Sequence, residues 1–133
     1  PVMLRLQSDL VDLVEAAIDG RLDATGAQWD PRPSLGVVMA AAPYPDTPRT
    51  GDVIVGLDDV PAMAKVFHAG TALDAEGRVV SAGGRVLCVA ALGESVSDAQ
   101  RNAYAGVAKV RWTNEFHRTD IGWRAIARER ADA

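Results

Sequence analysis

The chain has 133 residues, of which 48% are hydrophobic and 24% charged, enough to enclose one core in one compact domain with a short appendage. Its formal net charge of −4 comes from scattered acidic and basic residues, with no run of Lys or Arg that could follow a phosphate backbone. Nucleic acid is therefore not an expected partner, and no window approaches the roughly 20 apolar residues that a membrane span requires.

The cysteine content and the first residues bear on the cellular compartment. Cys88 is a single cysteine within the apolar stretch 86–90, so no intramolecular disulfide can form and we expect a small buried side chain in a cytoplasmic protein. Residues 1–5 lack the zones of a signal peptide, and the chain has no initiator Met. These features indicate a piece of a longer polypeptide.

The first predicted element is an amphipathic helix over residues 8–19. Ser8 is the candidate N-cap and Gly20 the candidate stop, and between them apolar residues recur on one helical face, namely Leu10, Leu13, Val14, Ala17 and Ile18. The stretch 21–33 is rich in Gly, Pro and Asp, which favour turns, so it is predicted to be a connector.

After residue 34 the pattern changes to short apolar segments separated by glycine. Strands are predicted over residues 35–41, 52–57, 65–68, 78–81 and 84–91. The sequences at 74–77 and 82–84 resemble reversals between neighbouring strands, and this favours an antiparallel sheet.

A second helix is predicted at about residues 98–109. The stretch from Ser97 to Gln100 has the form of a capping box, and apolar residues then recur at helical spacing, so this helix should cover one face of the sheet. In the tail, 111–133, we expect the apolar residues to anchor the chain to the core and the last few residues to fray. The predicted class is α+β, a small antiparallel sheet domain covered by a helix and preceded by an amphipathic helix.

The sequence contains no nucleophile–base pair, no phosphate-binding loop of the Walker type and no cluster spaced for metal ligation. His68 and His117 are each explained by a structural role with one hydrogen bond more readily than by catalysis. The loop 42–51 contains three prolines, which suits a surface that contacts another part of the protein, although a rigid connection explains it equally well.

The turn that contains Gly83, Gly84 and Arg85 is a candidate ligand site. Glycines allow a ligand to approach the backbone and leave N–H groups free, and an adjacent guanidinium can bind phosphate oxygens with paired hydrogen bonds. Glycine pairs in turns more often serve the turn itself, so both interpretations stay open from the residues alone.

Five blocks, taken together and in order, resemble the C-terminal region of the glycinamide ribonucleotide synthetase (phosphoribosylamine–glycine ligase) family. They are residues 35–40, 44–52, 67–71 (Phe-His-Ala-Gly-Thr), 83–89 (Gly-Gly-Arg-Val-Leu-Cys-Val) and 120–125. The resemblance spans nearly the whole chain. It implies that residues 1–33 are the end of an ATP-grasp domain with its connector, and that residues 34–133 are the C-terminal domain.

The resemblance also implies a reaction. The parent enzyme would use ATP with Mg²⁺ or Mn²⁺ to join glycine to 5-phosphoribosylamine in purine biosynthesis. The residues that hold ATP and the metal would lie before Pro1, in the ATP-grasp and N-terminal domains, which are then the partners of this chain. We therefore expect no catalytic and no metal-binding residue here, an inactive fragment, and a role in closing one wall of the active-site cleft.

Related ATP-grasp ligases of purine synthesis hold the ribose phosphate of their substrate with basic residues at the corresponding Gly-rich strand entry. The resemblance thus implies that Arg85, with Gly84 and Gly83, contacts the 5-phosphate, whereas Arg78 could assist or could be a solvated strand charge. For His68, Gly70 and Thr71, ligand contact and packing stay open.

One competing class is a non-catalytic protein-interaction module descended from such a ligase. A nucleic-acid-binding barrel is disfavoured, because the net-acidic chain has only seven aromatic residues for stacking.

Overall fold

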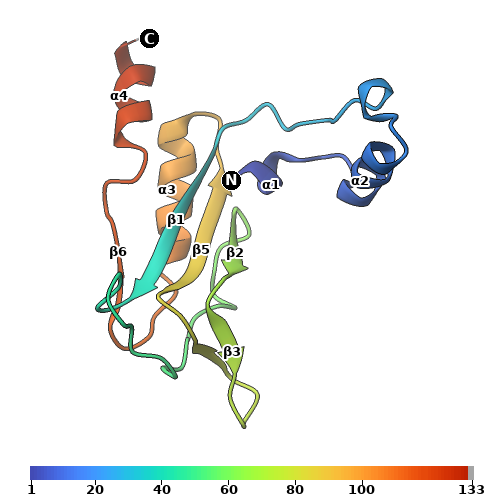
Figure 1. The fold of residues 1–133 in the computed structure, drawn as a ribbon. Helices are drawn as coiled ribbons and strands as arrows, with labels where there is room; N and C mark the ends of the chain where they lie inside the picture. The colour runs from blue at the N-terminus through green and yellow to red at the C-terminus, as the bar shows by residue number, and fades with distance from the viewer. Residues whose placement is uncertain (132–133) are drawn as a thin grey trace.

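A four-stranded antiparallel sheet in the order β2-β5-β1-β6 forms the centre of the protein. Its strands are β1 (Ser34–Ala41), β2 (Ala64–His68), β5 (Arg85–Leu92) and β6 (Glu115–His117), and a separate hairpin of β3 (Thr71–Leu73) and β4 (Val79–Ser81) extends beyond one end (Figure 1). The computed structural model describes residues 1–131. Fraying was expected for the last few residues, and two of these, 132 and 133, lie outside the described residues. The predicted α+β class with an antiparallel sheet is confirmed.

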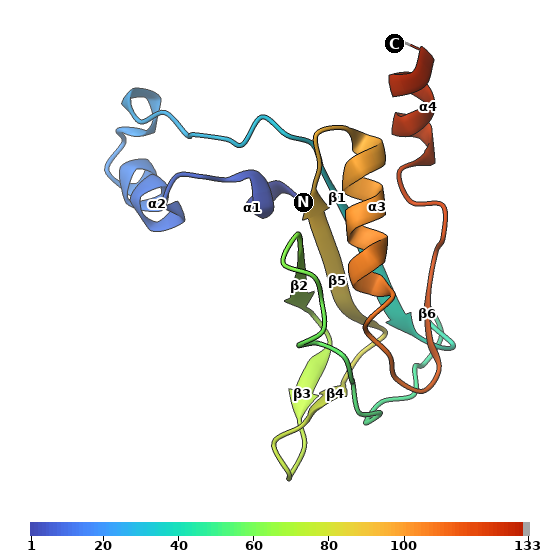
Figure 2. The same cartoon turned by 180° about the vertical axis from the view of Figure 1, so that it is seen from behind.

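Helix α3 (Val96–Val107) covers one face of the sheet, as predicted (Figure 2). Alternate residues of the two central strands, Val37, Met39, Leu87 and Val89, are fully buried beneath it. Burial of each such side chain stabilises the fold by about 1.5–3 kcal/mol. Helix and sheet approach closely because Gly106 lacks a side chain; a Cβ there would lie 2.8 Å from Cγ1 of Val89.

The first 33 residues form an arm that extends away from the sheet (Figures 1 and 2). It contains α1 (Val2–Arg5), α2 (Leu10–Ile18) and the short 3₁₀ helix η1 (Leu22–Ala24). The predicted helix over 8–19 is present, but its N-cap is Asp9, whose side chain accepts a hydrogen bond from the Val11 amide. The prediction of Ser8 as N-cap was wrong because its hydroxyl accepts a hydrogen bond from the amide of Gln28 across the arm.

Most of the apolar face of α2 is open to solvent. Leu10 and Val14 are each 49% exposed and Ile18 is 79% exposed. The helix ends as predicted at Gly20, which adopts a left-handed conformation with φ of 67°. A well-formed amphipathic helix with an uncovered apolar face has the properties of an element that packs against a surface absent from residues 1–131.

The predicted strand over residues 52–57 is not formed, which corrects the sequence analysis. Val53 forms an isolated bridge with Val80, whereas Val55 forms one with Arg111. The segment therefore changes partner within two residues and cannot build a continuous ladder. Gly56, with φ of 81°, turns the backbone immediately after the second bridge.

The turn at 82–84 also differs from the prediction. It was expected to reverse the chain between neighbouring strands, but β4 pairs with β3 while β5 pairs with β1 and β2, so this turn connects two different sheets. The reversal at 74–77 is confirmed as the turn of the β3–β4 hairpin, where the amide of Gly77 donates to the carbonyl of Asp74 at 3.0 Å.

The C-terminal tail is anchored by apolar side chains, as expected. Trp112 and Ile126 are both 7% exposed, and Ile121 packs against the core. The tail also contains two elements that the sequence analysis did not predict, β6 and the helix α4 (Trp123–Ala131). Their tertiary contacts, rather than a strong local pattern, hold them in place.

A carboxylate from α4 caps the N-terminus of α3. The two oxygens of Glu129 accept hydrogen bonds from the amides of Val96 (2.8 Å) and Ser97 (3.2 Å), and the hydroxyl of Ser97 also donates to Glu129 (3.1 Å). The local N-cap is Ser95, whose hydroxyl accepts from the Asp98 amide at 3.0 Å, so the prediction that the cap lies at Ser97 was wrong. Glu129 thus joins α4 to the covering helix.

These contacts predict a pH-dependent contribution to stability. The hydrogen bond from the Val96 amide, aided by those from Ser97 and opposed by partial burial, lowers the pKa of Glu129 below its ordinary value of 4.5. A carboxyl whose pKa is lower in the folded state stabilises the fold above its unfolded pKa, and the effect is lost as pH falls through the folded pKa. Glu129→Gln should therefore lower the Tm at neutral pH, and the difference from wild type should shrink in acid.

Thermal unfolding followed by circular dichroism between about pH 3 and pH 7 measures this difference. Glu76→Gln serves as the matched control, because Glu76 is exposed in the hairpin turn and caps no helix. Equal Tm values for wild type and Glu129→Gln at neutral pH would contradict the capping role.

Candidate functional site

The Gly-rich turn predicted to bind a ligand lies where the hairpin joins the central sheet. The amide of Gly70 donates to the carbonyl of Arg85 at 2.9 Å, and the amide of Ala82 donates to the carbonyl of Gly70 at 2.8 Å. The two chains touch, since a Cβ on Gly70 would lie 2.9 Å from the Cα of Gly83. The fold therefore brings together two sequence blocks, 67–71 and 83–89, that were recognised separately.

The proline-rich loop 42–51 is fastened to the same turn at both ends. The amide of Ala41 donates to the carbonyl of Gly84 at 2.9 Å, and the amide of Gly51 donates to the carbonyl of Ser81 at 2.6 Å. The ring of Tyr44 packs against Gly84 so closely that any side chain at position 84 would collide with it. The loop thus supports the turn as well as forming part of the surface.

A bulge between β1 and β5 determines where Arg85 points. Met39 is paired with Leu87 but Ala40 with Arg85, so Val86 is an extra residue in the ladder. Directly paired residues project from the same face, so Arg85 shares the face of Ala40, opposite to α3. The bulge lets Val86 fill the core at 0% exposure while Arg85 stays exposed.

The turn presents hydrogen-bond donors that the described residues leave unused. Neither the amide of Gly83 nor that of Gly84 donates to an acceptor within residues 1–131, and over the same range the Arg85 guanidinium forms no ion pair. Two neighbouring backbone N–H groups of half-buried glycines, followed by one exposed guanidinium, are groups that can bind an oxyanion. The three residues proposed from the sequence therefore form one contiguous donor set.

A second guanidinium lies at the same corner. Nη2 of Arg49, in the proline-rich loop, is 3.0 Å from Oδ1 of Asp52, which is itself buried. The amide of Asp52 donates to the hydroxyl of Ser81 at 3.2 Å, next to the Gly-rich turn. Sequence reasoning did not single out Arg49, because the contacts that place it beside the turn join segments about 30 residues apart and leave no local pattern.

The other candidates have structural partners. Nδ1 of His68 lies 3.0 Å from the hydroxyl of Thr71, so these two residues satisfy each other at the junction of β2 and β3. Arg78 forms ion pairs with Asp74 at 2.8 Å and Glu76 at 3.2 Å, so it is a solvated charge of the hairpin.

Cys88 and His117 have similarly modest roles. Cys88 was expected to be buried but is only half-buried, because it lies on the face of the sheet opposite α3; this partial burial raises the pKa of its thiol. His117 lies 3.3 Å from a Glu115 oxygen and is within aromatic contact of Tyr104, with ring centroids 6.2 Å apart.

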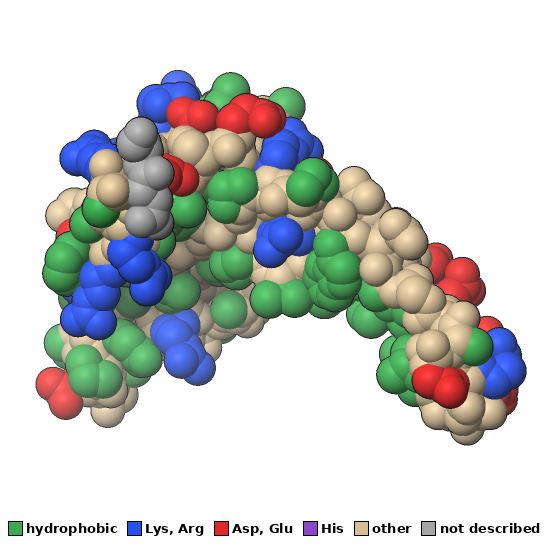
Figure 3. All heavy atoms as spheres, turned by 90° about the horizontal axis from the view of Figure 1, so that it is seen from above, with side chains coloured by type: hydrophobic (Ala, Val, Ile, Leu, Met, Phe, Trp, Pro, Cys, Tyr) green, Lys and Arg blue, Asp and Glu red, His purple; other side chains and the backbone are tan. Residues whose placement is uncertain are grey.

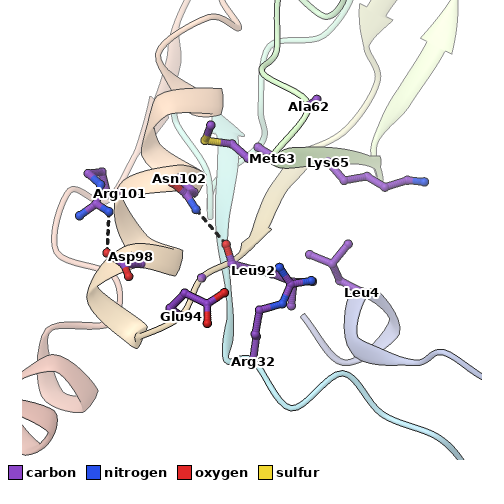
Figure 4. A pocket seen from close by; sticks show the side chains of 12 residues that line it. Leu4, Arg32, Ala62, Met63, Lys65, Leu92, Glu94, Asp98, Arg101 and Asn102 are labelled. Atoms are coloured by element: carbon purple, nitrogen blue, oxygen red, sulfur yellow. Dashed lines mark hydrogen bonds and ion pairs between the residues drawn. The ribbon is translucent and has the colours of Figure 1, made fainter.

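A cavity of about 570 Å³ lies between the arm, the segment before β2, and the start of α3 (Figure 4). Arg32 reaches into it from the connector, and bonds with Arg32 lower the pKa of Asp30 to about 2. Lys65 and Asn102 lie at its wall, and the side-chain Nδ2 of Asn102 donates to the backbone carbonyl of Leu92 at 2.9 Å. None of Gly83, Gly84 and Arg85 lines this cavity, so the predicted site is a separate, exposed corner.

Two further findings concern the described part of the chain. Across residues 1–131 no group of three or more His, Cys, Asp or Glu side chains is arranged to hold a metal ion. No helix within that range is both long and apolar enough to cross a bilayer.

Comparison with known proteins identifies relatives along nearly the entire chain. Residues 34–124 match the family described as phosphoribosylglycinamide synthetase, C domain. The phosphoribosylamine–glycine ligase of Xanthomonas campestris pv. campestris is 79% identical over 130 residues, covering 98% of this chain and 30% of the relative. That of Pseudomonas syringae pv. tomato is 60% identical, covering 99% of this chain and 31% of the relative.

A crystal structure of phosphoribosylamine–glycine ligase from Thermotoga maritima resembles the fold with a TM-score of 0.65 and 34% identity, over 82% of this chain and 27% of that one. The chain thus spans about 30% of the length of the curated relatives it matches. The family match covers the sheet, α3 and the Gly-rich turn. This chain belongs to the phosphoribosylglycinamide synthetase C-domain family.

Proposed function

We propose that the chain is the C-terminal portion of a phosphoribosylamine–glycine ligase of the cytoplasm. The parent enzyme would join glycine to 5-phosphoribosylamine with consumption of ATP, giving glycinamide ribonucleotide, ADP and phosphate in de novo purine biosynthesis. The names of relatives up to 79% identical support this proposal. Bound ATP and Mg²⁺ or Mn²⁺ would activate the glycine carboxylate, and their ligands belong to the preceding part of the enzyme.

The observation that carries a role for this chain is the donor set at the Gly-rich turn. The amides of Gly83 and Gly84 and the guanidinium of Arg85 would bind the 5-phosphate of phosphoribosylamine and orient its amine. Arg49, in the loop fastened to this turn, is ion-paired with the buried carboxylate of Asp52, so it would contribute hydrogen-bond donors rather than net charge. Binding and orientation need no acid–base pair from this chain.

We also propose the division at residue 33. Residues 1–33 would complete the preceding ATP-grasp domain, and residues 34–133 would form the C-terminal domain that closes one wall of the cleft. The family match begins at residue 34, and the buried residues of the core cluster all lie between Leu35 and Trp112. The arm meanwhile exposes apolar side chains that a neighbouring domain would cover: Val2, Met3, Leu10, Val11, Val14, Ile18, Leu22 and Trp29.

The role of Arg85 is tested in the complete ligase. Arg85→Ala should weaken the use of phosphoribosylamine by roughly 10- to 150-fold, because a guanidinium–phosphate pair in a partly desolvated cleft is lost. The dependence on ATP and glycine should change much less. Arg85→Lys should recover only part of the loss, since an ammonium cannot reproduce the paired hydrogen bonds.

Steady-state kinetics with each substrate varied in turn provides the measurement, and thermal melts verify that the variants fold. Arg78→Ala is the matched control, because Arg78 is paired within the hairpin. An unchanged phosphoribosylamine dependence in a stably folded Arg85→Ala enzyme would remove Arg85 from the site.

The isolated chain should form no glycinamide ribonucleotide from ATP, glycine and phosphoribosylamine. The physical reason is that this reaction depends on charge neutralisation around the transferred phosphoryl group, which the Gly-rich corner alone does not supply. An assay of ADP release and product formation with the purified chain checks this expectation. Turnover above the rate without protein would overturn the proposed division of labour.

The boundary at residue 33 is tested by removing residues 1–30. The remainder should unfold in one cooperative thermal transition, because the core cluster contains no residue from the arm. Some loss of Tm is expected, since Pro1 packs against Gly36 on the face of the sheet opposite α3. Loss of the sharp transition would instead show that the arm is part of this domain's own core.

A further inference from the structure

A second concave site lies at the other end of the molecule from the Gly-rich turn. A cavity of about 440 Å³ is formed between residues 118–122 and α4, and we call it the α4 cavity. Its lining includes Arg118, Asp120, Trp123, Arg124 and Arg128. Figure 1 shows α4 beyond one end of the sheet and the β3–β4 hairpin beyond the opposite end, so the two sites are separate. Nothing in the proposed ligase reaction uses the α4 cavity.

Among residues 1–131, the lining of the cavity holds more positive than negative charge. Arg124 and Arg128 are one helical turn apart, and within residues 1–131 neither forms an ion pair. Arg118 is neutralised by Asp120, to which it donates two hydrogen bonds of 2.8 and 2.6 Å. Figure 3 shows Lys and Arg side chains gathered on the part of the surface that carries α4. The lining thus holds two positive charges in a chain whose net charge is −4.

The described part of α4 holds one carboxylate, Glu129, and it is engaged elsewhere. Glu129 follows Arg128 directly, but its two oxygens accept hydrogen bonds from the amides of Val96 and Ser97 at the start of α3. Like charges at positions i and i+4 of a helix repel each other and destabilise it. An external anion in the cavity would relieve the repulsion between Arg124 and Arg128.

Trp123 adds an aromatic ring beside the arginines of the α4 cavity. Its side chain is 53% exposed, and the Cζ of Arg124 lies 5.2 Å from its ring centroid. Stacking occupies a face of the guanidinium and leaves the N–H groups at its edge free to donate. This contact favours orientations of Arg124 in which its edge N–H groups can meet an oxyanion.

We propose that the α4 cavity binds a phosphate group, taken either as inorganic phosphate or as the phosphate of a nucleotide. A phosphate dianion matches the two uncompensated arginines in charge, and its oxygens suit the fork of a guanidinium. A nucleotide would in addition place its base near the exposed Trp123 ring, whereas inorganic phosphate would use the arginines alone.

The test is a titration of the ¹⁵N-labelled 133-residue chain followed by two-dimensional NMR, which reports folding and the place of binding together. Inorganic phosphate, adenosine monophosphate and adenosine are each added to about 10 mM at constant ionic strength, so that millimolar dissociation constants are detected. The two phosphate ligands should shift the resonances of residues 118–128, and adenosine should not. Equal affinities for inorganic phosphate and adenosine monophosphate would show that the phosphate group alone is bound. Tighter binding of adenosine monophosphate would show that its base makes a second contact.

Arginine variants separate this site from the Gly-rich turn and from general attraction of anions. The double substitution Arg124→Ala with Arg128→Ala should weaken binding at least roughly tenfold. Arg21→Ala, in the arm, removes a charge elsewhere and should leave binding unchanged. Arg85→Ala should also leave the shifts at 118–128 intact, so failure here and failure of the proposed ligase site are distinguishable.

Three outcomes would overturn the proposal. The first is that neither phosphate ligand shifts the resonances of residues 118–128. The second is that the double variant shows the same shifts as the wild type. The third is that adenosine, which has no phosphate, causes the same shifts as the two phosphate ligands. In each case the arginines around α4 would be solvated charges without a ligand.

Discussion

The pairing of β1 with β5 is the interaction on which the other elements depend. These two strands are the centre of the sheet, and their α3-facing residues are fully buried. Much of the domain is attached to this ladder: β2 and β6 at its edges, α3 across one face, and the Gly-rich turn at the start of β5. The bulge at Val86 turns Arg85 to the opposite face from α3 without a gap in the core, so packing and site geometry are determined by the same irregularity.

The α3 side of the domain and the arm differ in how far their apolar side chains are covered. The α3 face is closed by alanines that allow close contact, Ala99 and Ala103, both fully buried. The arm, by contrast, presents an ordered helix with its apolar side uncovered. A domain that packs against another domain is expected to combine a self-sufficient core with such an open surface, because cores fold within domains while interfaces between domains are completed only on assembly.

The sequence predicted those elements that have a local apolar pattern. Strands β1 and β5 were found as apolar segments bounded by turn residues, and the helices α2 and α3 because their apolar residues recur at helix spacing. Residues 52–57 have a strand-like composition but pair with two different partners, which only the tertiary structure reveals. Helix α4 was not predicted because charged residues interrupt its apolar ones and, among its described residues, Ile126 alone is buried. At the site, the glycines and Arg85 were visible as a motif, whereas the bulge and the placement of Arg49 arise from pairing between distant segments.

The bond between Glu129 and α3 has a consequence for local opening of the protein. Since α4 buries little apolar surface, it is suited to detach as a unit while the sheet stays intact. Each such event would strip the first amides of α3 of their acceptor, so the end of the covering helix and the C-terminal helix would fray together. An anion held at Arg124 and Arg128 would slow that event. Two segments about 30 residues apart, Val96–Ser97 and α4, would thereby open as one cooperative unit, and an anion bound at α4 would lengthen its lifetime.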